Sequence, residues 1–134
     1  PSFVDNHDVD RFLAGGSEAG LKQALLTLMS LPGIPVIYYG TEQGFRAQRA
    51  SMFAAGYGSG GRSHFDREAP LYRYLARVSA LRREHPVLAK GQVQVLASSS
   101  AGPGAIAWRV DDGNTRRLVL INSADTPRLL ADLD

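Results

Sequence analysis

The sequence predicts an α/β fold followed by antiparallel β structure, and three observations lead to this expectation. The apolar run at residues 36–39 does not alternate with polar residues, which is the pattern of a parallel strand buried on both faces. Upstream of it, Leu21, Leu25 and Leu28 recur at helical spacing. After Gln92 the apolar residues alternate with others, and this period is typical of antiparallel strands.

The first three elements are a strand, a helix and a strand. Residues 3–6 open with an apolar, β-type pair and are predicted to form the first strand. Ser17 is a suitable N-cap for a helix that runs to Leu31, where the Pro-Gly pair at 32–33 stops it. Residues 36–39 then form the second strand, so the segment is a βαβ unit with two parallel strands.

A long loop and a second helix follow. Residues 45–67 carry no sustained period and hold several glycines, so we predict a loop with a short helix over 49–55. The next helix has an apolar stripe at helical spacing that starts at Leu71 and ends at Leu81. Basic residues at 82–83 suit the negative end of the helix dipole, and the following proline ends the helix.

Antiparallel strands are predicted after Gln92, with turn signals at 101–104 and 111–114 between them. A fourth strand is predicted to begin near Arg128. Trp108 lies among the inward-facing residues of this region, where a core tryptophan is more usual than a surface platform for sugars.

The change of period near residues 89–91 predicts a boundary between two domains. The first covers residues 1–89 and is α/β, and the second covers residues 90–134 and is all-β.

Composition excludes several classes of protein. The 44% hydrophobic content is that of a globular chain with a core, and no apolar run is long enough to span a membrane. Thirteen arginines and two lysines give a net charge of only +2, and the arginines are scattered between acids, which argues against a nucleic-acid partner. The absence of cysteine excludes disulfides and thiolate chemistry and fits either a secreted or a cytoplasmic protein.

Two segments with polar ends carry a family resemblance. They are Phe-Val-Asp-Asn-His-Asp at 3–8 and Gly-Ile-Pro-Val-Ile-Tyr-Tyr-Gly-Thr-Glu-Gln-Gly at 33–44. In this order and at this separation they resemble the α-amylase family, glycoside hydrolase family 13, at the seventh and eighth strands of its (β/α)8 barrel. The resemblance implies the last two β/α units of a TIM barrel followed by part of an antiparallel β-sandwich domain.

The resemblance also implies that the chain is a piece of a larger protein. A (β/α)8 barrel needs roughly 250 residues, whereas this chain has 134. We therefore expect the remaining N-terminal part of the barrel as its structural partner.

The resemblance assigns roles to residues at the ends of both strands. Asp8 would be catalytic, as the carboxylate that hydrogen-bonds two hydroxyls of the glucose unit being cleaved and stabilises the transition state. The other candidates either bind substrate, namely His7, Asn6 and Arg49, or support the site, namely Asp5, Glu42 and Tyr39. Read without the resemblance, Asp-Asn-His-Asp is also a turn in which Asp8 or Asp10 caps the next helix.

The family's nucleophile and acid/base would lie upstream of Pro1, so the segment alone is predicted to be inactive. The implied activity is retaining cleavage of α-glucosidic bonds in starch-like glucans or maltooligosaccharides, or transglycosylation by the same chemistry.

The residues form no complete metal site, and calcium, which the family often binds, would belong to the full-length parent. A non-catalytic amylase-like interaction subunit is a rival, and a nucleic-acid-binding β-domain is the weakest alternative.

The string Gly-Tyr-Gly-Ser-Gly-Gly at 56–61 matches the pattern of dinucleotide-binding loops, but it does not join a strand to a helix. A substrate-side loop is the better interpretation. Within it, Phe53 and Tyr57 either stack on sugar rings or anchor the loop as buried apolar surface.

Overall fold

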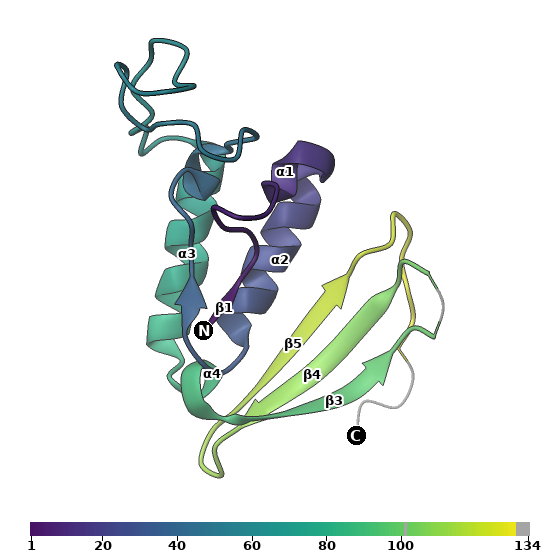
Figure 1. Cartoon of the computed structure of the whole chain (residues 1–134). Helices are drawn as coiled ribbons and strands as arrows, with labels where there is room; N and C mark the ends of the chain where they lie inside the picture. Colours follow the sequence, from purple (N-terminus) through teal and green to yellow (C-terminus); the bar gives the residue numbers. More distant parts are fainter. Residues whose placement is uncertain (101, 131–134) are drawn as a thin grey trace.

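The structure, a computed structural model, describes residues 1–100 and 102–130. It has a helical part with a two-stranded sheet and, beside it, a three-stranded sheet (Figure 1). The helices are α1 (Phe12–Gly15), α2 (Glu18–Ser30), α3 (Pro70–Glu84) and α4 (Val87–Lys90), with a 3-10 helix η1 at Thr41–Gln43. The strands are β1 (Ser2–Phe3), β2 (Pro35–Val36), β3 (Gln92–Ser98), β4 (Ala105–Asp111) and β5 (Arg116–Asn122).

The strands β1 and β2 are parallel neighbours, with Ser2 opposite Pro35 and Phe3 opposite Val36, which confirms the predicted βαβ unit. Both are shorter than the predicted strands at 3–6 and 36–39. The ladder stops after two residues: the chain bends at Val4 after β1, and it leaves the strand at Ile37 and turns at Tyr39 after β2.

The prediction that residues 36–39 are buried on both faces is wrong for this chain. Val36 is 43% exposed, and Tyr39 is similarly open. Helices cover one side only, where Val4 and Ile37 pack against the apolar cluster of α1, α2 and α3. The other face of this strand pair has no cover among the described residues.

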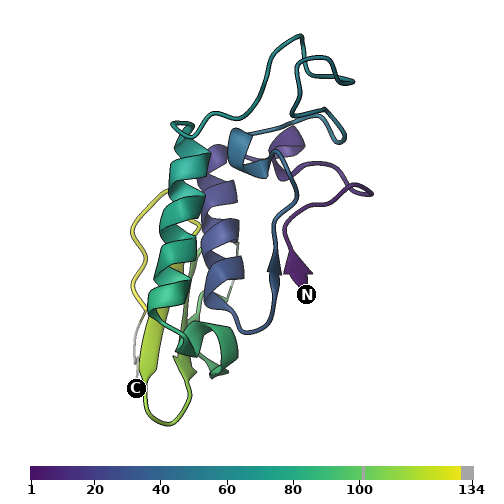
Figure 2. The ribbon, with the colours of Figure 1, turned by 90° about the vertical axis from the view of Figure 1, so that its left-hand side faces the viewer.

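The helices α2 and α3 lie side by side, as both views show (Figures 1 and 2). Ser17 is the N-cap of α2 as predicted, because its hydroxyl accepts a hydrogen bond of 3.0 Å from the Gly20 amide. Leu21 and Leu25 are fully buried and pack against Leu71 of α3. Burying one such leucine stabilises the fold by about 1.5–3 kcal/mol, so this seam holds the helical part together.

Arg82 connects the C-terminal end of α2 to α4. The sequence predicted for Arg82 only an interaction with the dipole of its own helix, α3. Its Nη1 donates to the carbonyl oxygens of Met29, Leu31 and Leu88 at 2.7–3.1 Å. Its Nη2 donates to the Gly33 carbonyl at 2.6 Å. One guanidinium thus satisfies carbonyls at the end of α2, in the turn that follows and in α4.

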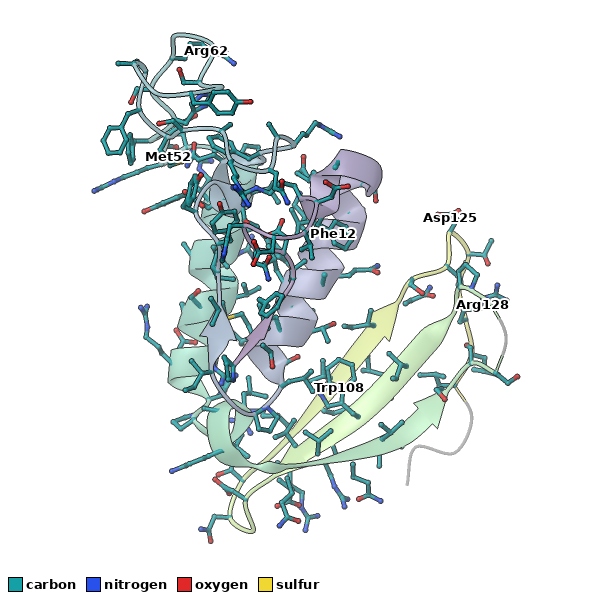
Figure 3. All side chains as sticks on the ribbon, in the orientation of Figure 1. Phe12, Met52, Arg62, Trp108, Asp125 and Arg128 are labelled. Atoms are coloured by element: carbon teal, nitrogen blue, oxygen red, sulfur yellow. The ribbon has the colours of Figure 1, made fainter. Side chains whose placement is uncertain are left out.

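The strands β3, β4 and β5 form an antiparallel sheet, as predicted. Trp108 points from β4 toward the helices (Figure 3) and is buried with Val87, Leu88 and Val110, which confirms it as a core residue. The sheet and α4 therefore share one apolar core. Residues 123–130 hold no strand, so the fourth strand predicted near Arg128 is absent as far as Leu130.

The predicted helix over 49–55 is also wrong, because this stretch forms turns. Glycines with positive φ at Gly58, Gly60 and Gly61 favour tight turns over a helix in the same loop. The whole loop extends beyond the N-terminal end of α3 (Figure 1). Over residues 1–100 and 102–130, no helix is long and apolar enough to cross a membrane.

Candidate active site

The carboxyl ends of β1 and β2 are joined by a buried polar cluster of Asp5, Arg11 and Thr41. The Thr41 hydroxyl donates to Asp5 Oδ1 at 3.1 Å, and Arg11 Nη1 lies 3.8 Å from the same oxygen and 3.4 Å from the Thr41 Oγ1. All three side chains are less than 5% exposed. Buried side chains can stay charged when they are paired and hydrogen-bonded, and the Asp5 carboxylate and the Arg11 guanidinium meet both conditions.

Arg11 extends this cluster to two further segments of backbone. Its Nη2 donates to the Tyr39 carbonyl at 2.7 Å, and its Nε donates to the Ala47 carbonyl at 3.4 Å. Its guanidinium also lies over the Tyr38 ring, 3.9 Å from the centroid. One arginine therefore ties together the segments after β1, after β2 and at the start of the long loop.

The exposed rim of the site lies in the turn after β1. Asp8 is 67% exposed on its side chain, and its carboxylate lies 3.2 Å from His7 Nε2 and 3.6 Å from Arg49 Nη2. Arg49 Nε also donates to the His7 carbonyl at 3.0 Å. The turn is closed by Asn6, whose Oδ1 accepts from the amides of Asp8 and Val9 at 2.7 and 3.2 Å. An open carboxylate flanked by donors can exchange hydrogen bonds with a polyhydroxyl ligand.

The helix-capping interpretation of Asp8 and Asp10 is not what the structure shows. The N-cap residue of α1 is Arg11, and its side chain makes no capping hydrogen bond. The Phe12 amide, at the start of this helix, donates to Asp5 Oδ2 at 3.1 Å. The buried Asp5 therefore caps the start of this helix, and Asp8 remains at the exposed rim without a capping role.

Glu42 lies at the same end of the strand pair as Asp8, as expected, but it lines a different hollow. That hollow, at the N-terminal ends of α2 and α3, is also lined by Glu18, Arg46 and Leu71. Asp5, the other acidic residue predicted to support the site, accepts hydrogen bonds from the Thr41 hydroxyl and the Phe12 amide. The supporting role of Glu42 stays a prediction.

Aromatic rings surround the arginine at the centre of the cluster. Tyr39 contributes its carbonyl to Arg11, and its ring packs edge-on against Tyr38 and Phe45. The pKa of Tyr38 is raised above its usual value, first by a hydrogen bond with the Tyr39 side chain and then by burial. Tyr38 therefore stays neutral near pH 7 and presents a π face to the Arg11 guanidinium.

Neither Arg11 nor Tyr38 was identified from the sequence. An arginine next to a polar turn usually lies on the surface, and only the packing of three loops buries this one. In residues 1–100 and 102–130 there is no group of three or more His, Asp or Glu side chains that could hold a metal. Calcium binding by the full-length parent, which the family resemblance implies, stays a prediction.

Comparison with known proteins identifies the relatives of this chain, although models of known protein families give no match. The chain is 36% identical over 98 residues to a cyclomaltodextrin glucanotransferase of Thermoanaerobacterium thermosulfurigenes, an alignment of 69% of this chain and 12% of that protein. It is 35% identical over 99 residues to an α-amylase of Niallia circulans, covering 69% of this chain and 17% of the amylase.

Solved structures agree with these sequence relatives. A cyclomaltodextrin glucanotransferase with a three-domain ABC distribution superposes with a TM-score of 0.72 and 30% identity over 90% of this chain and 24% of its own. An α-amylase from H. orenii gives a TM-score of 0.70 and 25% identity, covering 90% and 29%. The chain belongs to the α-amylase family, glycoside hydrolase family 13.

The solved α-amylase-family structures are TIM-barrel proteins, and such barrels hold their active sites at the carboxyl ends of the strands. Asp8 and His7 lie at this end of β1, and Arg49 reaches them from the loop after β2. The chain spans less than a fifth of the length of these two curated relatives.

Proposed function

We propose that this chain is part of a retaining enzyme that acts on α-glucosidic bonds of starch-like glucans or maltooligosaccharides. Residues 1–89 would supply the seventh and eighth β/α units of the barrel, and residues 90–134 would begin the C-terminal β-domain. The names of the relatives, which are amylases and cyclomaltodextrin glucanotransferases, support the class of substrate.

The uncovered face of the β1–β2 pair supports the proposal that the rest of a barrel packs there. Phe3, Ile34 and Val36 are all exposed on or beside these strands. Exposed apolar surface of this kind, together with unpaired strand edges, favours association with further strands. The N-terminal part of the barrel is the partner that this surface fits.

Asp8 carries the proposed chemistry. The observation that supports it is an exposed carboxylate at the carboxyl end of β1, held by His7 and Arg49 and free of any capping role. It would accept hydrogen bonds from two hydroxyls of one glucose unit, and its negative charge would stabilise the positive charge that develops on the sugar ring. His7 and Arg49 would donate to hydroxyls of the same unit and keep the carboxylate oriented.

The rest of the retaining mechanism needs two further carboxyl groups, a nucleophile and an acid/base, about 5–5.5 Å apart. We assign both to residues that precede Pro1 in the intact protein, so residues 1–134 alone should show no turnover of starch. Transglycosylation is the second candidate outcome, because several relatives are glucanotransferases. Analysis of products in the presence of an added acceptor sugar separates it from hydrolysis.

The test is Asp8→Asn in the intact protein, with starch as the substrate. The substitution keeps the shape of the side chain but removes its charge, so kcat should fall by about 100-fold or more while the fold is retained. Asp10→Asn is the matched control, since Asp10 is an exposed aspartate two residues away, and it should leave kcat near normal. Near-normal kcat in Asp8→Asn would show that the catalytic assignment is mistaken.

A further inference from the structure

A pair of hydrogen bonds between Gln43 and Asp66 closes the base of the glycine-rich loop, residues 45–65. The Gln43 side chain donates from Nε2 to the Asp66 carbonyl at 3.0 Å, and its Oε1 accepts from the Asp66 amide at 3.2 Å. One side-chain amide thus exchanges two hydrogen bonds with the backbone of one residue, as two peptide groups do in an antiparallel ladder. The Gln43–Asp66 pair therefore joins the chain before the loop to the chain after it.

Aromatic side chains do not anchor the outer part of this loop. Phe53 is 68% exposed and Tyr57 is 85% exposed, so the interpretation of these two rings as buried anchors is wrong. Met52, which belongs to the small apolar core of the loop, lies near its base, and Arg62 lies near its tip (Figure 3). The position of the loop therefore depends on the contacts at its base.

Contacts inside the loop join its outgoing half to its returning half, residues 59–65. The His64 amide donates to the Met52 carbonyl at 2.8 Å. The His64 ring also packs edge-on against the Phe45 ring, with the ring centroids 4.9 Å apart. A displacement of the returning half would therefore also displace the outgoing half, which carries Arg49.

The two halves are held to the rest of the site by different contacts. The outgoing half is held by the Arg11 Nε, which donates to the Ala47 carbonyl, and by the Arg49 Nε, which donates to the His7 carbonyl. In residues 1–100 and 102–130, the returning side has no hydrogen bond to the chain before the loop except those of the Gln43–Asp66 pair. Without this pair, the loop would be held at its outgoing half only.

Gln43 is itself held in place by the buried cluster. It is the last residue of η1, and the first residue of η1 is Thr41, whose hydroxyl donates to the buried Asp5. The Gln43–Asp66 pair thus connects the buried cluster to the loop. Through the loop it also connects the cluster to Arg49, whose guanidinium lies 3.6 Å from the Asp8 carboxylate.

We propose that Gln43 is a positioning residue for the proposed reaction. Through its pair with Asp66 it holds the loop of residues 45–65 in the place where Arg49 faces Asp8. Gln43 acts through Arg49 and contacts no substrate in this role. The inference rests on the proposed function, because the orientation of Asp8 matters only if Asp8 stabilises the transition state.

The test is Gln43→Ala in the intact protein, with starch as the substrate. We expect kcat to fall by about 3- to 10-fold, a part of the roughly 100-fold that a misplacement of about 1 Å can cost. KM should change less, because Asp8 acts in the transition state. The urea concentration at the midpoint of unfolding should stay near that of the wild type, since both lost hydrogen bonds are exposed.

Two variants serve as controls. Gln43→Glu keeps the acceptor for the Asp66 amide but loses the donor to the Asp66 carbonyl, so its kcat should lie between those of Gln43→Ala and the wild type. Gln23→Ala is the matched control, because Gln23 Nε2 likewise donates to a backbone carbonyl, that of Asn122 at 2.7 Å, but joins α2 to β5 instead of closing the loop. It should leave kcat unchanged.

Two further measurements separate positioning from a general loss of structure. Arg49→Ala already removes the group that Gln43 positions, so adding Gln43→Ala to it should lower kcat further by less than about 2-fold. Backbone hydrogen exchange over residues 45–65 should be faster in Gln43→Ala and unchanged in Gln23→Ala, because only the former opens the base of the loop.

Three outcomes would overturn the inference. They are a wild-type kcat in Gln43→Ala, an equal loss of kcat in Gln23→Ala, and an undiminished further loss when Gln43→Ala is added to Arg49→Ala. Asp8→Asn measured alongside separates this inference from the proposed function. If Asp8→Asn loses turnover while Gln43→Ala does not, only the positioning role is refuted, and if Asp8→Asn has no effect, the proposed function itself fails.

Discussion

Removing the Arg11 side chain should be among the most damaging single substitutions in this chain. Arg11 is 2% exposed, donates to two backbone carbonyls and to Thr41, and pairs with Asp5. In Arg11→Ala the Asp5 carboxylate would stay buried without its counter-charge, and the Tyr39 carbonyl would lose its donor. Breaking a buried pair by removing one partner costs about 3–5 kcal/mol, a large part of the 5–15 kcal/mol by which a typical domain is stable.

Urea unfolding of the intact protein measures this loss. Arg83→Ala is the control, since Arg83 is exposed on α3, and surface changes of this kind usually stay within about 0.5 kcal/mol. Arg11→Lys should fall between the two, because lysine keeps the charge but not the planar fork that reaches several acceptors. A loss below about 1 kcal/mol in Arg11→Ala would refute the argument that the cluster holds the strand ends together.

A double substitution tests whether the cluster acts as a unit. Asp5→Asn should cost less in an Arg11→Ala background than alone, because the unpaired charge has then been removed. Strictly additive losses would show that Arg11 and Asp5 contribute independently.

Three further expectations follow from single positions. Gly40→Ala should lower the free energy of unfolding by about 2 kcal/mol or more, because Gly40 has a φ of +83° and a Cβ there would lie 2.4 Å from the Phe45 ring. Gly113→Ala is the control: it has a similar φ but open space around it, so the free energy of unfolding should fall clearly less in the same assay. The pKa of Asp111 is lowered, first by the Gly113 amide, so its stabilisation is present above the ordinary carboxyl value of about 3.9 and lost as pH falls below it. The difference in melting temperature between wild type and Asp111→Asn should thus shrink in acid. Glu42→Gln should change the unfolding free energy by less than about 0.5 kcal/mol, since Glu42 is partly exposed and lines an open hollow.

Long, periodic elements were predictable from the sequence. The stripe of Leu21 and Leu25 fixed the buried face of α2, and Ser17 fixed its start, because a hydroxyl just before an apolar helix has one common use. The alternation around Trp108 likewise predicted the antiparallel sheet and its core. In these elements the local sequence pattern and the tertiary packing favour the same structure, so the local pattern alone is enough to predict it.

Short elements and the buried cluster were not predictable. The helices α1 and α4 have four residues each, too few to show a period, and the 3-10 helix at Thr41–Gln43 follows a glycine in the left-handed region. The residues at 49–55 have no period either, and the helix predicted there failed because the neighbouring glycines close turns instead. Arg11 escaped notice because its hydrogen-bond acceptors at Tyr39 and Thr41 lie about 30 residues away, where no local pattern points to it.

The motif after β1 separates into two layers that the linear sequence does not distinguish. Asp5 and Asp8 are the same residue type three positions apart, yet one is buried with a guanidinium, a hydroxyl and a helix amide, and the other stands in solvent. The buried Asp5 can hold the segments after β1 and β2 in place, because its surroundings offer it no other partners. The exposed one can accept hydroxyls of a ligand because its own partners, His7 and Arg49, leave its oxygens accessible. Loss of Asp5 should therefore appear as lost stability together with lost activity, whereas loss of Asp8 should appear as lost activity alone.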